Sequence, residues 1–314
     1  MTSILVTGAA GAVGRAFLEV LAEKELPGPV TATDLHRPIG LPDGIDFVEL
    51  DVRDDEPDRV IGKVKPDVVV HLASIVTPPK GASPELAYDV DVNGTQNILS
   101  ACRRHNVRRL VVTSSGAAYG YHEDNSVPLR ENDPIRGNEE FPYSHHKRLV
   151  EEMLAKARKT TPKLEQVILR VGTVLGDRIE NQITDLFQQP KVVAVQGSDS
   201  PFVFIWTNDL ARILLRAATD GPPGIYNVAG DGAVDVNELG RIMGKPVTRI
   251  PAWVLKMVLR VVRVVGLSQY GPEQVRFLQY RPVLDNTRLK TEFGYTPQKT
   301  SAEVFADWWD AARP

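Results

Sequence analysis

The sequence contains one cysteine, Cys102, so no internal disulfide can form. Scarce cysteine is typical of proteins from reducing compartments, and we therefore expect a cytoplasmic location. A small buried side chain, rather than a nucleophile, is the simpler interpretation of this lone thiol. An excess of charge of one sign is also lacking, because the chain has 37 Lys and Arg residues and 40 Asp and Glu residues. With no basic run long enough to act as a tail, nothing favours nucleic acid as a partner.

Long apolar runs are missing as well. The first apolar run is too short for a signal peptide, and no stretch reaches the roughly 18 residues of a membrane span. The nearest approach, residues 252–266, is interrupted by Lys256, Arg260 and Arg263. These three are spaced for one face of a helix, so we expect a core-facing helix with a solvated basic stripe. A membrane-surface helix and a lid over an apolar substrate are the alternatives.

A glycine-rich turn lies between the strand signal of residues 3–6 and the helix signal that starts at Arg15. Gly8 would make the tight turn, Gly11 would let the backbone approach a pyrophosphate, and Gly14 would let the helix pack closely. The helix N-terminus offers unpaired N–H groups and partial positive charge to that pyrophosphate. We therefore expect a dinucleotide to contact Gly8, Ala10, Gly11, Ala12, Val13 and Gly14.

An acid follows where this motif requires one. Asp34 ends the next apolar run, about 20 residues past the last glycine, and is placed to bind both ribose hydroxyls. A carboxylate there repels a 2′-phosphate and favours NAD. Arg37 lies close by and suits a phosphate, so NADP is the less favoured cofactor.

Strand and helix signals alternate through the first half of the chain. Apolar runs at 30–33, 47–50, 67–72, 110–115 and 167–170 alternate with helical patterns, including 85–105 and 143–159. This order predicts an α/β fold with a doubly wound parallel sheet of the Rossmann type. Beyond residue 172 the alternation of strand and helix signals is less regular. We expect a nucleotide-binding domain of 1–172 plus 206–232 and a smaller, mostly C-terminal substrate lobe of 173–205 plus 233–314.

Tyr143 and Lys147 are four residues apart and share one face of a predicted helix. A phenol ionises near pH 10, and a neighbouring ammonium or an oxidised nicotinamide lowers that pKa. Tyr143 would then exchange a proton with a substrate hydroxyl or carbonyl. The pair opens the helix that follows a strand ending in Thr113, Ser114 and Ser115.

Together these stretches resemble the extended short-chain dehydrogenase/reductases of the NAD-dependent epimerase/dehydratase family, over nearly the whole chain. The resemblance implies that Ser115, Tyr143 and Lys147 are catalytic, with Ser114 as the competing serine. It implies substrate contacts at Ser115, Gly116, Thr173 and Trp206, and further determinants within 75–79, 178–187, 195–206 and 253–281. Besides the glycine turn, the implied NAD contacts are Asp34, Asp51, Val52, Leu72, Ala73, Ser74, Asn93, Thr113, Tyr143, Lys147 and Val171.

Some positions depart from the best-known members of that family. Gly116 stands where the 4,6-dehydratases carry an acid, and Thr173 where sugar-nucleotide epimerases carry an asparagine. His146 replaces the usual serine before the lysine. Adjacent His145 and His146 point in different directions on a helix, and no acid or cysteine cluster completes a site, so we expect no metal.

These features predict an NAD-dependent oxidoreductase that moves a hydride at a secondary alcohol or ketone of a small-molecule substrate, with Tyr143 as acid/base. A sugar-nucleotide epimerase is the first alternative. A non-catalytic nucleotide-sensing scaffold is the second, although the presence of both Tyr143 and Lys147 counts against it. The helices expected at 85–105 and 143–159 resemble those of the family's dimer bundle, so a homodimer is expected.

Overall fold

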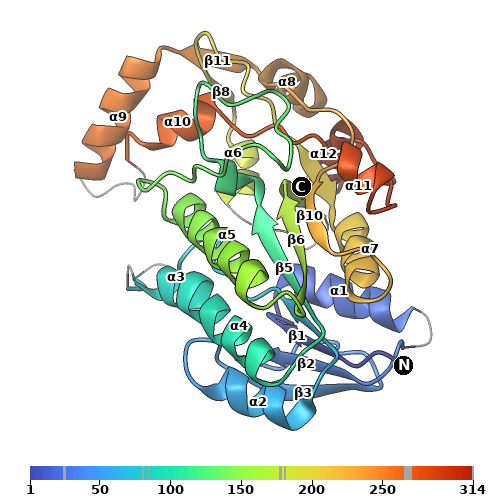
Figure 1. The fold of residues 1–314 in the computed structure, drawn as a ribbon. Helices are drawn as coiled ribbons and strands as arrows, with labels where there is room; N and C mark the ends of the chain where they lie inside the picture. The colour runs from blue at the N-terminus through green and yellow to red at the C-terminus, as the bar shows by residue number, and fades with distance from the viewer. Residues whose placement is uncertain are drawn as a thin grey trace.

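A seven-stranded parallel sheet forms the centre of the computed structural model, which describes residues 1–23, 26–79, 81–83, 85–176, 179, 182–264 and 271–312. The strand order is β10-β6-β5-β4-β1-β2-β3, and every neighbouring pair is parallel (Figure 1). The strands are β1 (Ile4–Thr7), β2 (Val30–Asp34), β3 (Ile45–Glu49), β4 (Val68–His71), β5 (Arg109–Ser115), β6 (Glu165–Val171) and β10 (Gly224–Val228).

Helices cover both faces of this sheet, which explains why β1 and β4 are buried along their whole length. One apolar cluster joins the sheet to α1 (Ala12–Ala22), α7 (Thr207–Ala218) and α11 (Thr287–Thr291). A second cluster joins the opposite face to α2 (Glu56–Val64), α4 (Gly94–Arg104) and α5 (Pro142–Thr160). The predicted doubly wound α/β fold is confirmed.

The strand order reverses between β1 and β4, because β2 and β3 extend the sheet to one side of β1 and β5 and β6 extend it beyond β4. In parallel sheets of this kind, ligands bind outside the carboxyl ends of the strands at that reversal. The turns that leave β1 and β4 therefore mark the expected ligand site.

The helix expected over 85–105 is interrupted. It consists of a short α3 (Leu86–Tyr88), a π-helical turn η1 (Asp89–Asn93) and α4. A π-turn adds one residue to a helical turn, and this changes which side chains face inward. The change affects one residue expected to contact the cofactor, as described below.

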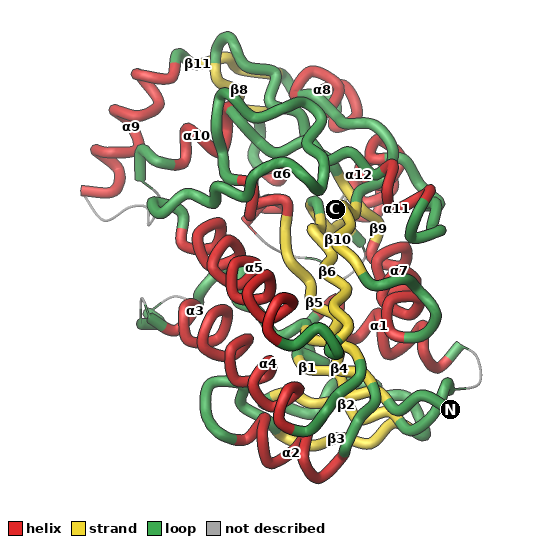
Figure 2. The backbone as a smooth tube through the Cα atoms, in the orientation of Figure 1, coloured by secondary structure: helices red, strands yellow, loops and turns green. Residues whose placement is uncertain are grey.

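The remaining elements form a group beyond the carboxyl ends of β5 and β6, where short strands and helices are joined by long loops (Figures 1 and 2). Two small parallel pairs lie there, β7 (Thr173–Leu175) with β9 (Phe204–Trp206) and β8 (Val192–Val195) with β11 (Val247–Ile250). The helices of this group are α6 (Gln182–Gln188), α8 (Val236–Met243), α9 (Ala252–Val264), α10 (Gln274–Gln279) and α12 (Ser301–Ala312).

An aromatic core, with Phe187, Phe204 and Phe305 at its centre, holds much of this group together. The predicted division into 1–172 plus 206–232 and 173–205 plus 233–314 stays a prediction. Leu289 and Phe293, from the second set of ranges, pack in the cluster on the large sheet. Within the described residues, none of the helices has the length and apolar character needed to cross a membrane.

Candidate active site

The glycine turn has the geometry of a dinucleotide cradle. Gly8 has φ +69°, a conformation that L side chains rarely adopt, and a Cβ there would lie 2.5 Å from the Ala73 nitrogen. A Cβ on Gly14 would collide with the Gly8 carbonyl oxygen. Gly11 is the N-cap of α1, and no side chain caps this helix, so its first-turn N–H groups are open to an anion.

Asp34 lies at the carboxyl end of β2 and is tied to this turn. Its Oδ2 accepts a hydrogen bond of 2.9 Å from the Ala10 N–H, and its Oδ1 accepts one of 2.8 Å from the Leu35 N–H. Among the described residues, Arg37 makes no ion pair with this carboxylate, and its guanidinium lies 5.9 Å from the centre of the Phe47 ring. The acid and the glycine turn therefore form one unit, as the motif predicts.

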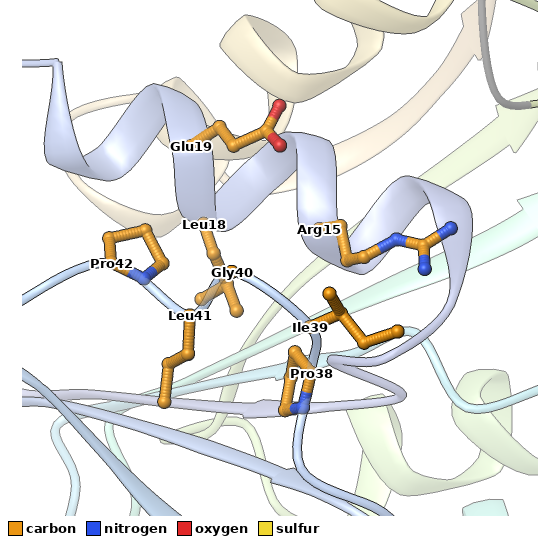
Figure 3. Close-up of a pocket in the computed structure, with 8 residues that line it drawn as sticks. All are labelled: Arg15, Leu18, Glu19, Pro38, Ile39, Gly40, Leu41 and Pro42. Atoms are coloured by element: carbon orange, nitrogen blue, oxygen red, sulfur yellow. The ribbon is translucent and has the colours of Figure 1, made fainter.

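Figure 3 shows a crevice close to this unit, where Leu18 of α1 points toward the loop of residues 38–42, while the Glu19 carboxylate points away from it. The Nε atom of Arg15 is buried without a hydrogen-bond partner. The crevice lies between α1 and the loop after β2, away from Tyr143. None of the residues that line it belongs to the group around Tyr143 described below.

The residues expected around the rest of the cofactor lie at neighbouring strand ends. Asp51 follows β3 and pairs with Arg53, which holds the pKa of this carboxyl below its usual range. Val52 is buried, and its carbonyl accepts a hydrogen bond of 2.9 Å from Asn97. After β4, the Leu72 N–H donates to the Thr7 carbonyl at 3.1 Å, which places residues 72–74 against the glycine turn.

Ser115, Tyr143 and Lys147 meet where β5 ends and α5 begins. The pKa of the half-buried Tyr143 phenol is raised by burial and by the charge of Asp91, while a hydrogen bond with Ser115 opposes the rise. The Lys147 ammonium lies 5.4 Å from the centre of the Tyr143 ring and donates a 3.2 Å hydrogen bond to the Thr113 carbonyl. Burial lowers the pKa of Lys147, and the charges of Asp91 and Glu151 oppose this.

The two adjacent serines of β5 face different surroundings. The Ser114 hydroxyl donates a 2.6 Å hydrogen bond to Glu151, whose carboxylate pairs with the buried Arg170 at 2.7 Å. Ser115 instead lies with Tyr143, and its Oγ accepts a 3.1 Å hydrogen bond from the Ala117 N–H. Alternation along a strand explains the division. The geometry therefore favours Ser115 over Ser114 as the residue that faces a substrate.

Asp91 is a buried acid that the sequence motifs do not indicate. It lies in the π-turn η1 and accepts hydrogen bonds from the Ser74 hydroxyl at 2.8 Å and the Ile75 N–H at 3.0 Å. Its other oxygen lies 3.3 Å from Nδ1 of His146. This carboxylate joins the loop after β4 to the helix that carries Tyr143, and only the irregular turn directs it inward.

Asn93 is not brought to this group. It is exposed at the end of η1, and its side-chain amide donates a 2.8 Å hydrogen bond to Asp89. The expected support of the nicotinamide end by Asn93 stays a prediction. The π-turn places Asp91 on the inner side instead.

The expected substrate residues are only partly brought together. Gly116 follows Ser115, and a Cβ there would lie 3.2 Å from Leu284, so little space exists for a larger side chain. Val171 ends β6, and Ser115 lies 3.5 Å from its carbonyl oxygen. Thr173 begins β7, where its N–H donates to Val203.

Trp206 lies elsewhere in the group beyond the sheet. It packs against the aromatic core that includes Phe305 of α12, and the Lys299 ammonium lies 3.9 Å from its ring centre. No described contact joins Trp206 to Tyr143. Of the ranges expected to hold further determinants, residues 178, 180–181 and 265–270 lie outside the described part of the chain.

A half-buried cation, Arg281, lies beyond the aromatic residues next to Tyr143. Tyr121 packs with Tyr143 and Phe141 and makes an edge contact with Phe277 at 5.4 Å. The Arg281 guanidinium lies 5.0 Å from the centre of the Phe277 ring and donates to the Ser200 carbonyl. Its Nε is buried without a hydrogen-bond partner, and burial lowers the pKa of Arg281 to about 9. Among the described residues no carboxylate pairs with it.

Comparison with known proteins identifies the family. The sequence profile of the NAD dependent epimerase/dehydratase family matches residues 4–229. The chain belongs to this family. Its members include the NAD-dependent enzymes that the motifs resemble, so the predicted resemblance, the enzyme class and NAD as cofactor are confirmed. The cradle at Gly8 and Gly14 fits that cofactor on geometric grounds.

Individual relatives are similar to this chain over most of their own length. A putative UDP-glucose 4-epimerase of Methanocaldococcus jannaschii is 30% identical over 75% of this chain and 79% of its own length. An uncharacterized protein of Mycobacterium tuberculosis is 26% identical over 98% of this chain and 83% of its own. The solved structure of the Thermus thermophilus UDP-glucose 4-epimerase in complex with NAD is 24% identical, covers 98% of both chains and has a TM-score of 0.74.

Proposed function

We propose that this protein is an epimerase that acts on a nucleoside-diphosphate sugar, oxidising and re-reducing one carbinol carbon on tightly held NAD. One observation carries the proposal: Tyr143, Ser115 and the buried Lys147 lie together at the carboxyl edge of the sheet that holds the glycine cradle. The names of the relatives support the substrate class.

In this proposal Tyr143 removes the proton from the substrate hydroxyl and returns it to the ketone. Ser115 holds the reacting oxygen by a hydrogen bond, and the Lys147 ammonium stabilises the phenolate form of Tyr143. Bound NAD supplies the hydride acceptor and a further positive charge. The residues that would hold NAD are the glycine turn, Asp34, Asp51 with Val52, and Leu72-Ala73-Ser74.

Arg281 supports a substrate that carries an anion. A guanidinium binds phosphate in a bidentate geometry, and this one is half-buried next to Tyr121, without a carboxylate partner among the described residues. A diphosphate would supply the missing charge. We propose that Arg281 binds the diphosphate, while Tyr121 and Phe277 line the path to Tyr143.

Gly116 argues against a dehydratase. Water elimination needs an acid and a base beside the reacting oxygen, and Gly116 has no side chain that could supply either. Net dehydrogenation of a secondary alcohol is the second candidate. It is favoured by Thr173, which stands where the known sugar-nucleotide epimerases carry an asparagine.

A panel of nucleoside-diphosphate hexoses distinguishes the candidates. The purified protein should contain bound NAD and interconvert two epimers without any rise in NADH absorbance. Accumulation of NADH with added NAD would show that the reaction is net dehydrogenation and not epimerisation.

Arg281→Met should raise the KM for the sugar nucleotide by roughly 10- to 100-fold, because a charged hydrogen bond is lost, and should leave NAD content unchanged. An unchanged KM would exclude Arg281 from the substrate site.

We also propose the expected homodimer, formed through α4 and α5, and a cytoplasmic location. The dimer is supported by the adjacency of these two helices on one side of the sheet (Figure 1). Sedimentation velocity on the purified protein measures the oligomeric state, and a monomer at micromolar concentration would contradict the proposed dimer.

A further inference from the structure

Helix α9 has three distinct faces, and within the described part of the chain one of them is packed against other elements. Leu255 and Leu259 are four residues apart and share the inner face. Leu255 is buried in a small cluster with Val195 of β8 and Val275 of α10, and Leu259 packs against the same cluster. This face fixes α9 to the protein at the outer edge of the group beyond the sheet (Figure 1).

The second face is apolar and exposed. Trp253, Met257 and Val261 recur at intervals of four residues, and 68%, 53% and 57% of their respective surfaces are exposed. Val258 extends this face and is 47% exposed. Among the described residues, no other helix exposes more than one large apolar side chain. A concentration of this kind on a charged surface marks an interaction site.

The third face adjoins the apolar one and is cationic. Lys256 and Arg260 are four residues apart, both are exposed, and neither makes an ion pair within the part of the chain that the structure describes. Arg263 lies one turn further and contacts Glu273 at 3.4 Å. The helix therefore presents aliphatic groups and an indole beside free ammonium and guanidinium groups.

This combination matches the surface of an anionic lipid bilayer. Basic residues on an amphipathic helix bind lipid phosphates, aliphatic side chains enter the headgroup–acyl boundary, and tryptophan is favoured at that depth. A soluble acidic partner would match the cationic face but leave the apolar one exposed. A second copy of the chain would bring like charges together.

We propose that α9 docks this protein on anionic membrane surfaces, with Trp253, Met257 and Val261 inserted and Lys256 and Arg260 bound to lipid phosphates. The docking is peripheral, because α9 has 13 residues and is too short to span a bilayer. It does not depend on the proposed sugar-nucleotide chemistry.

The docked surface lies close to the candidate active site. Helix α10 packs under α9 through Val275, and Phe277 of the same short helix meets Tyr121 beside Tyr143. A bilayer that held α9 would therefore lie one helix away from the aromatic wall of the site.

Vesicle sedimentation tests the proposal with the full-length protein. We expect binding to vesicles of mixed phosphatidylcholine and phosphatidylglycerol and little binding to pure phosphatidylcholine. The bound protein should show a blue shift of tryptophan fluorescence, because Trp253 is exposed whereas Trp308 and Trp309 are buried. Equal binding to both vesicle types, or none to the mixed vesicles, would overturn the proposal.

Variants identify the surface that binds. Each basic residue near an anionic membrane contributes roughly a factor of five in affinity, so Lys256→Gln with Arg260→Gln should weaken binding about 25-fold. Trp253→Ser with Met257→Ser should remove the blue shift and most of the binding. Lys63→Gln with Lys65→Gln, which neutralises two exposed lysines at the end of α2, is the charge-matched control and should bind normally.

Two further results would count against the proposal. One is an equal loss of binding in the α9 variants and in the control pair. The other is a dimer in sedimentation velocity that Trp253→Ser dissociates, which would show that a second copy covers this face. All four variants alter exposed side chains, and an unchanged thermal unfolding midpoint will confirm that each one is folded.

Discussion

Ser114 and Ser115 are adjacent on β5, and their surroundings give them different roles. Ser114 hydrogen-bonds Glu151 inside a buried polar network that includes Arg170. Ser115 shares a hydrogen bond with Tyr143 at the open end of the strand. The sequence predicts that two hydroxyls end this strand, but the choice between them depends on which one meets α5.

Replacing each serine separately tests this division. Ser115→Ala should lower kcat about 10²-fold, because the reacting oxygen loses a positioned hydrogen-bond donor. Ser114→Ala should leave kcat nearly unchanged and cost about 1–3 kcal/mol of unfolding free energy, because a buried carboxylate loses a donor. Steady-state kinetics and urea unfolding measure the two effects, and a reversed pattern would assign the catalytic role to Ser114.

Among the elements, the π-turn η1 is one that the helical periodicity of the sequence does not predict. The sequence predicts one continuous helix over 85–105 and directs attention to Asn93. The π-turn exposes Asn93 and buries Asp91 between Ser74 and His146. A 3.6-residue repeat does not show where one extra residue enters a turn, so the acid that connects α5 to the loop after β4 was not predicted.

The contact between α5 and β6 depends on a buried ion pair. The Glu151 and Arg170 side chains are 3% and 5% exposed, and the pair is bidentate. Arg170→Met should cost about 3–5 kcal/mol of unfolding free energy, because Glu151 keeps a buried charge without its partner.

An exposed pair on the same sheet supplies the control for that experiment. Arg108 contacts Glu165 at 3.1 Å with 43% of its side chain exposed, so Arg108→Met should cost less than about 1 kcal/mol. Urea denaturation measures both values. Equal losses in the two variants would show that the buried pair contributes no more than a surface pair.

At the scale of the whole molecule, the fold can be predicted from the sequence where strands and helices alternate regularly along the chain. Alternating apolar strands and helical patterns up to residue 172 predict the parallel sheet, because each crossover must return along one face. Spacing within short motifs is sufficient to predict the Gly8–Gly14 turn, Asp34, Tyr143 and Lys147 as site residues. Arg281 was not singled out, because it reaches the aromatic wall through contacts between segments far apart in the sequence.

The stability of the whole protein in acid depends in part on the buried His71, and the direction in which this residue changes the unfolding free energy with pH can be predicted. Burial between Thr7 and Thr95 lowers the pKa of His71 to about 3, from an ordinary value of 6.5. The unfolded chain therefore binds one more proton than the folded chain between these pH values. The associated stability is fully present above pH 6.5 and is lost as the pH falls.

Between pH 6.5 and 5 this group should remove about 2 kcal/mol of unfolding free energy. His71→Asn keeps a hydrogen-bonding side chain and does not titrate, so its unfolding free energy should fall less over that interval. Chemical denaturation at a series of pH values compares the two slopes. Identical slopes would show that His71 is not the group that titrates.

Tyr143→Phe tests the central claim most directly, because it removes one hydroxyl and keeps the ring. Turnover of a nucleoside-diphosphate hexose by the purified variant should fall by at least about 10²-fold, while the amount of bound NAD per chain stays that of the wild type. Turnover close to the wild-type rate, with NAD still bound, would contradict the assignment of Tyr143 as the acid/base.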